Sequence, residues 1–166
     1  ALSPFGVVSA TLPASPGAQS APVLALIAHM DTSPEASDEG IRPQVAEHWS
    51  GEPIELDPQG RIVLSPALFP ELDAHRGEDI ICTDGTTLLG ADDKAGIAAI
   101  MDALDWFRRH PQQPHAAVRV FFTPDEEIGR GTEHLSVPDI GASYGFTVDG
   151  GEVGGLDSET FNAAEA

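Results

Sequence analysis

Lysine and cysteine are almost absent from this sequence of 166 residues, and basic residues of any kind are few. Eight Lys and Arg stand against 27 Asp and Glu, which gives a formal net charge of −19. Proteins that bind nucleic acids or anionic membranes depend on clustered Lys and Arg. Here the arginines are scattered and Lys94 is the single lysine. We therefore expect no nucleic-acid or membrane partner, and we favour cations or the cationic ends of substrates.

Long apolar runs and targeting signals are also missing. No stretch approaches the ~20 apolar residues of a membrane span, and residues 1–5 carry neither a basic nor an apolar signal region. Because Cys82 is the one cysteine, no intrachain disulfide is possible. Apolar residues make up 41% of the chain, which is enough for a packed core. We expect a folded, cytoplasmic protein.

Short apolar runs between turn residues predict strands at 5–12, 23–28, 80–82, 118–122 and 144–148. The continuous runs at 23–28 and 118–122 are typical of strands buried on both faces. Apolar residues from Ile97 to Phe107 recur at helical spacing, which predicts a helix from about Asp93 to Pro111. A second, short helix is expected at 132–135. This alternation predicts an α/β fold with a mostly parallel central sheet and flanking helices.

Residues 32–72 depart from this pattern. Their first half is acidic and rich in Pro and Gly, and short apolar pieces follow at 54–56 and 61–64. We interpret this segment as a surface excursion with small hairpin strands. Residues 161–166 have the character of a further strand rather than of a polar tail, so we expect the chain to be a fragment.

Four clusters of acidic residues, one of which includes a histidine, lie next to predicted elements. Three of them follow a strand, and one lies at the start of the helix. They are His29 and Asp31 after the run 23–28, Asp92 at the helix start, Glu126 and Glu127 after 118–122, and Asp149 after 144–148. Sites in open α/β sheets form beyond the carboxyl ends of the strands, so these groups are expected to converge. Converging carboxylates repel one another unless a cation lies among them. A pair of divalent metal ions, bridged by one carboxylate such as Asp92, meets that need.

The residue types also divide the chemical roles. His29 offers an imidazole ligand, and Asp31 lies two residues on, on the same side of an extended segment, where it can hold that imidazole. Glu126 and Glu127 point different ways, so one can bind metal while the other takes a proton from water. Asp149 completes the set as a terminal ligand.

Each cluster also has a simpler explanation. His29 and Asp31 could be a polar strand end, and Asp92 with Asp93 could cap a helix. The pair Glu126 and Glu127 could lie in a solvated turn, and residues 149–150 could form another turn. These separate explanations do not account for the fact that all four clusters lie next to a predicted strand or helix.

Four motifs resemble those of the dinuclear-zinc exopeptidase family, which holds tripeptide aminopeptidases, glutamate carboxypeptidase and acetylornithine deacylase. The motifs are HMDTSP at 29–34, TDGTTLLGADDKAG at 83–96, FTPDEEIG at 122–129 and TVDGG at 147–151. Their order and spacing most closely resemble the tripeptide aminopeptidases, and the resemblance spans nearly the whole chain. It implies a zinc-exopeptidase-like catalytic domain with two Zn²⁺ ions.

The resemblance also implies a role for each site residue. One zinc would be held by His29, Asp92 and Asp149, and the other by Asp92 as the bridge together with Glu127. Glu126 would be the general base, and Asp31 would support His29. The peptide bond between Asp92 and Asp93 would be cis.

Several parts of the family pattern are missing from residues 1–166, which we interpret as a partial catalytic domain. The lid domain, which would mediate a homodimer and help to bind substrate, is absent, as are the C-terminal return of the catalytic domain and its zinc-binding histidine. The second zinc site therefore lacks a ligand, and we expect this chain to be inactive alone.

The expected activity is hydrolysis of the N-terminal bond of short peptides by a zinc-bound hydroxide. The alternatives are a carboxypeptidase or N-acyl amino-acid deacylase with the same metal centre, or an inactive metal-binding acidic domain.

Overall fold

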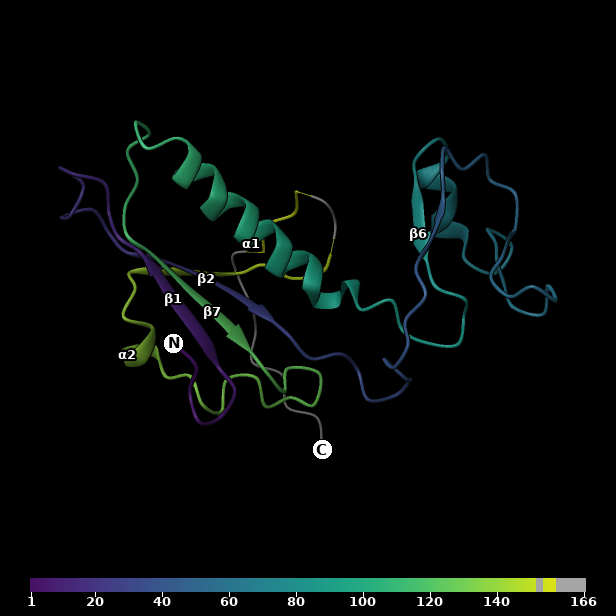
Figure 1. Ribbon diagram of the computed structural model, residues 1–166, viewed down its shortest axis with the longest axis horizontal. Coiled ribbons are helices and arrows are strands. Elements are labelled where there is room, and N and C mark those ends of the chain that lie inside the picture. The colour runs from purple at the N-terminus through teal and green to yellow at the C-terminus, as the bar shows by residue number, and fades with distance from the viewer. Residues whose placement is uncertain (152–153, 158–166) are drawn as a thin grey trace.

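A four-stranded sheet forms the centre of the structure, a computed structural model that describes residues 1–151 and 154–157 (Figure 1). The strands lie in the order β1 (Val8–Leu12), β7 (Val118–Thr123), β2 (Leu24–His29) and β8 (Tyr144–Thr147). β2 is parallel to both β7 and β8, whereas β1 is antiparallel to β7. The predicted α/β fold with a mostly parallel sheet is confirmed. Residues 161–166, predicted as a strand, lie outside the described residues.

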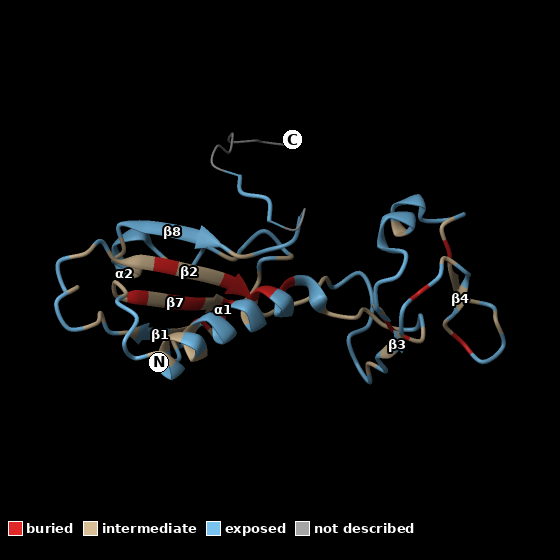
Figure 2. Ribbon diagram, turned by 90° about the horizontal axis from the view of Figure 1, so that it is seen from above, coloured by how far each residue is buried: buried red, intermediate tan, exposed pale blue. Residues whose placement is uncertain are grey.

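The helix α1 (Ala91–Arg109) covers one face of this sheet. Ile100, on the apolar stripe predicted from the sequence, is 2% exposed and belongs to one core cluster with Ala28, Val118 and Val120. Burial is concentrated in β2 and β7, the two inner strands (Figure 2). All four residues of the edge strand β8 are exposed. The inner strands are more buried than β8 because the apolar stripe of α1 packs over them.

The segment between β7 and β8 runs back along the sheet, because β8 is parallel to β2 and β7, and it contains a short helix. The helix predicted at 132–135 is wrong, because residues 131–134 form turns and α2 spans Val137–Ile140. The Ser136 side chain accepts the Asp139 N–H as the cap of α2, and a proline occupies its first turn. Cap and proline together favour a helix that begins at Val137, five residues after the predicted start.

Residues 32–90 lie to one side of the sheet and form two small antiparallel pairs (Figure 1). β3 (Gln44–Ala46) pairs with β6 (Ile80–Cys82), and β4 (Ile54–Glu55) pairs with β5 (Val63–Leu64). A 3₁₀ helix, η1 (Pro70–His75), lies between β5 and β6. The chain thus leaves the sheet after β2 and returns to it at α1. No helix in the described part of the chain is long and apolar enough to cross a membrane.

Truncation of the core residue of α1 tests this packing. We expect Ile100→Ala to lower the free energy of unfolding by about 2–5 kcal/mol, because it removes a buried side chain and leaves a cavity. Met101→Ala is the matched control on the same helix, where the side chain is 51% exposed. Its cost should stay below about 1 kcal/mol in urea unfolding followed by circular dichroism. Equal losses for the two variants would contradict the packing of α1 on the sheet.

Candidate metal centre

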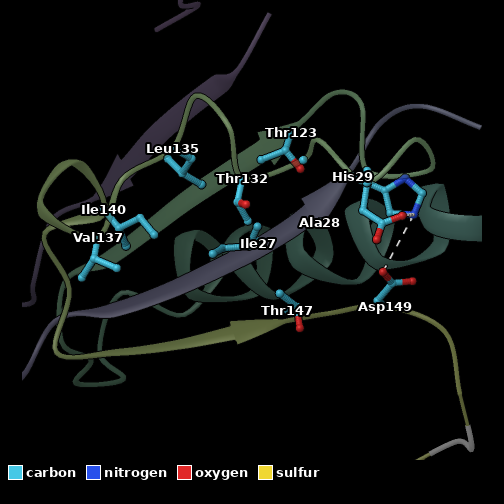
Figure 3. Close-up of a pocket in the computed structure, with 13 residues that line it drawn as sticks. Ile27, Ala28, His29, Thr123, Thr132, Leu135, Val137, Ile140, Thr147 and Asp149 are labelled. Atoms are coloured by element: carbon cyan, nitrogen blue, oxygen red, sulfur yellow. Dashed lines mark ion pairs between the residues drawn. The ribbon is translucent and has the colours of Figure 1, made fainter. Parts of the chain in front are cut away.

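His29, the last residue of β2, lies at the centre of the predicted site and is 3% exposed. Its Nε2 atom is 2.9 Å from Asp92 Oδ1, 3.8 Å from Asp149 Oδ2 and 3.9 Å from Glu126 Oε2. Figure 3 shows the approach of Asp149 to the imidazole. The structure therefore brings together residues from β2, the start of α1, the turn after β7 and the end of β8, as the parallel topology predicts.

The donor atoms at this point fit a divalent metal ion. Two groups each place one possible ligand atom per residue within 4.8 Å of the others; they are His29, Asp92 and Glu127, and His29, Asp93 and Asp149. Imidazole nitrogen and carboxylate oxygen are ligands that zinc and other first-row metals accept. The described residues thus form groups that could hold metal, and the division of the ligands between two zinc ions stays a prediction.

Asp31 holds two parts of the site together. Its carboxylate accepts the N–H of Glu126 at 3.2 Å and the N–H of Glu127 at 3.0 Å. His29 Nδ1 lies 3.0 Å from the Asp31 backbone carbonyl oxygen and 3.4 Å from Asp31 Oδ1. An Nδ1–H that donates to this carbonyl leaves the Nε2 lone pair facing Asp92. The sequence pointed to a contact of Asp31 with the imidazole, but the contact with the glutamate turn was not predicted.

The two glutamates after β7 face different spaces. Glu126 lines a cavity of about 540 Å³, whereas Glu127 lines another of about 400 Å³ together with Asp92. The first cavity is walled by the apolar side chains of Ile27, Leu135, Val137 and Ile140, with His29 and Asp149 at one end (Figure 3). A small ligand that bound there would lie beside Glu126. The two side chains thus point different ways, as the sequence led us to expect, and their separate roles stay a prediction.

Asp93 is a site residue that sequence reasoning did not assign. It is 2% exposed, and its Oδ1 accepts the N–H of Gly96 at 3.1 Å. Asp92, its neighbour, is 66% exposed in its side chain. Backbone dihedrals at both residues are non-helical, and the bond between them is cis, as the family resemblance implied. Helix capping and proposed metal binding thus fall on different members of the pair.

Charge around His29 changes its proton affinity. Burial disfavours the charged imidazole, but the hydrogen bond with Asp92 and the charges of Asp149 and Asp31 outweigh this, so the pKa of His29 is raised above 6.5. A metal ion must displace a proton from a protonated imidazole. Binding should therefore weaken as the pH falls through the raised pKa.

Comparisons with known proteins find relatives of the kind that the motifs resemble. Residues 88–159 match the sequence profile of Peptidase family M20/M25/M40. The chain is 52% identical over 161 residues to a peptidase T of Geobacillus thermodenitrificans and 51% identical over 161 residues to one of Desulfitobacterium hafniense. In both comparisons, 97% of this chain aligns with 39% of the relative. The chain thus spans about 39% of the length of these curated relatives.

Solved structures agree with the sequence relatives. The aminopeptidase PepT of Bacillus cereus ATCC 10987 matches 87% of this chain with a TM-score of 0.60 and 27% identity, over 30% of its own length. A tripeptidase of Staphylococcus aureus matches 89% of this chain with a TM-score of 0.56 and 28% identity, also over 30% of its length. These findings confirm the resemblance and the α/β fold predicted from the sequence.

The raised pKa of His29 can be measured in the metal-free protein by NMR titration. We expect the imidazole to titrate above 6.5, and Asp92→Asn to lower its pKa, because the substitution removes a negative hydrogen-bond partner. In the metal-free protein the raised pKa stabilises the fold at low pH, and this contribution is lost as the pH rises through it. Asp102→Asn, an exposed acid on the same helix, is the control and should leave His29 unchanged. A His29 pKa insensitive to Asp92→Asn would contradict the contact.

Proposed function

We propose that this chain, which shares the motifs and the fold of peptidase T, forms part of the catalytic domain of a metal-dependent tripeptide aminopeptidase. The observation that carries the proposal is the convergence of three carboxylates within 4 Å of the Nε2 atom of the buried His29 imidazole. Similarity to peptidase T over 97% of the chain supports the choice of substrate class. In this proposal the substrate is a short peptide with a free N-terminus.

The ligand assignment follows the donor groups and the family motifs. We assign His29, Asp92 and Asp149 to one Zn²⁺, and Asp92 with Glu127 to the second. When bound, such ions polarise a carbonyl group and lower the pKa of a water molecule. The shared position of Asp92 and Glu127 beside one cavity supports their assignment to the same ion.

Glu126 is assigned the role of general base. Its side chain is 52% exposed, so water and substrate can reach it, and its Oε2 lies 3.9 Å from His29 Nε2. In the proposed reaction Glu126 takes one proton from the attacking water while the water oxygen bonds to the first peptide carbonyl carbon. The same carboxyl group then gives the proton to the amine nitrogen as the C–N bond breaks. Asp31 would position Glu126 through the backbone N–H that its carboxylate accepts.

The remaining features belong to the intact protein. We propose that a lid domain and a further histidine ligand lie in parts of the relatives that this chain does not span, that the lid forms a homodimer, and that the protein is cytoplasmic. The chain of 166 residues alone should then hydrolyse no tripeptide. Ultracentrifugation and cell fractionation of the complete gene product test the dimer and the location.

Substitution of the two glutamates separates their roles in the complete gene product. We expect Glu126→Gln to lower kcat by about 10²- to 10⁴-fold while zinc content stays unchanged, because it removes only the proton acceptor. Glu127→Gln should instead weaken zinc binding, as measured by metal analysis after dialysis. Glu133→Gln, an exposed glutamate paired with Arg130 in the same segment, is the control and should change neither property. Loss of zinc in Glu126→Gln would contradict its role as base.

The substrate class is tested by comparing a free tripeptide with the same peptide blocked at its N-terminus. The aminopeptidase proposal expects cleavage of the free peptide only, with release of its first residue. Cleavage of the blocked peptide would favour the carboxypeptidase or deacylase alternative. Zinc binding without hydrolysis of either peptide would favour an inactive metal-binding domain.

A further inference from the structure

The Asp93 carboxylate makes a second contact that reaches beyond its own helix. Its Oδ2 accepts the backbone N–H of His29 at 3.1 Å, while its Oδ1 accepts the N–H of Gly96 at 3.1 Å. One buried side chain therefore joins the last residue of β2 to the first regular turn of α1. A buried carboxylate is costly unless hydrogen-bonded, and here each oxygen has an N–H donor.

The His29 N–H needs such a partner because the ladder with β8 ends before it, whereas the pairing of β2 with β7 continues to His29 and Thr123. β2 and β8 pair from Leu24 with Tyr144 to Ile27 with Thr147, and the N–H of Val148 closes this ladder on the Ile27 carbonyl. Within the described residues, β8 has no residue that pairs with His29. Asp93 thus supplies the acceptor that a longer strand would have supplied.

Gly96 allows the same contact from the other side. A Cβ atom at this position would lie 2.0 Å from the Val148 carbonyl oxygen and 2.4 Å from Asp93 Oδ1. Because Gly96 has no side chain, its backbone can lie close to the Asp93 carboxylate and to the carbonyl of Val148, the residue that precedes Asp149. The elements that carry Asp92, His29 and Asp149 therefore meet at the contact between Asp93 and Gly96.

We infer that Asp93 is a positioning residue of the proposed metal centre, which fixes the backbone of His29 relative to Asp92 and Asp149 and does not itself bind metal. The inference rests on the proposed function for the identity of the centre. Asp93 also belongs to a group with His29 and Asp149 that could hold an ion, so direct ligation is the rival role. Burial of Asp93 and the donors on both its oxygens favour positioning.

Asp93→Ser separates helix capping from the contact with His29. Serine is a good cap and can still accept the Gly96 N–H, but its single hydroxyl cannot also hold the His29 N–H. In the complete gene product we expect the thermal midpoint to fall, because the His29 N–H loses its buried acceptor. We expect the Kd for zinc, measured against a chromophoric chelator, to rise by about 10- to 100-fold. In the metal-free protein, hydrogen exchange of the His29 amide should accelerate while other β2 amides stay protected. Asp93→Asn, which retains the shape of aspartate, provides the same measurements should Asp93→Ser fail to fold.

Ser136→Ala is the matched control, since it removes a helix cap from α2 and should leave zinc affinity unchanged. The inference would be overturned if Asp93→Ser had the same zinc affinity and the same exchange rate of the His29 amide as the unchanged protein. Asp93 would then be a helix cap only. Loss of one zinc per chain, together with an altered visible spectrum of the cobalt-substituted protein, would overturn it in favour of direct ligation. Failure of the unchanged protein to bind zinc at all would instead count against the proposed function.

Discussion

The concentration of negative charge around one buried imidazole is the constraint on which the site depends. The arginines of the protein do not relieve it. Six of them form ion pairs with carboxylates elsewhere, at Asp57, Asp73, Asp84, Asp105 and Glu133, and Arg119 donates to the backbone carbonyl of Asp139. Among the residues that the structure describes, none of the ion pairs of these arginines involves a proposed metal ligand. The balancing positive charge must come from protons or from bound cations, and metal ions are the cations that this donor set fits.

The parallel sheet creates this concentration. β7, β2 and β8 end at the same edge, so the acidic residues that follow each strand are carried to one place, and α1 adds its first residues there. The site also depends on contacts that hold these ends in register. Asp31 fastens the glutamate turn to the segment after β2, and Asp93 fastens α1 to β2. Both aspartates accept backbone N–H groups, and these contacts set the positions of the chain segments around the proposed metal centre.

The sequence predicts the elements and the residue types well because both follow short-range rules. Apolar runs, a helical repeat and four acidic clusters were enough to place the sheet, α1 and the convergence at His29. The division of labour between Asp92 and Asp93 could not be predicted from the residues, since the two are adjacent and identical. Local backbone geometry turns one outward and buries the other. The helix at 132–135 was misplaced for a related reason, because a single cap and proline decide where so short a helix begins.

The overall acidity of the chain and the acidity of the site have separate origins. Five acids are assigned to the proposed centre, namely Asp31, Asp92, Glu126, Glu127 and Asp149, and two divalent ions would change the formal charge from −19 to −15. Most of the negative charge therefore lies outside the site. Asp105 illustrates the contrast, since hydrogen bonds from Arg108 and Arg109 lower the pKa of its carboxyl group. Asp105 thus has its cations in the same helix, whereas none of the arginine ion pairs in the described part of the chain involves a carboxylate around His29. Topology, rather than composition, is what distinguishes the candidate site from the rest of this acidic surface.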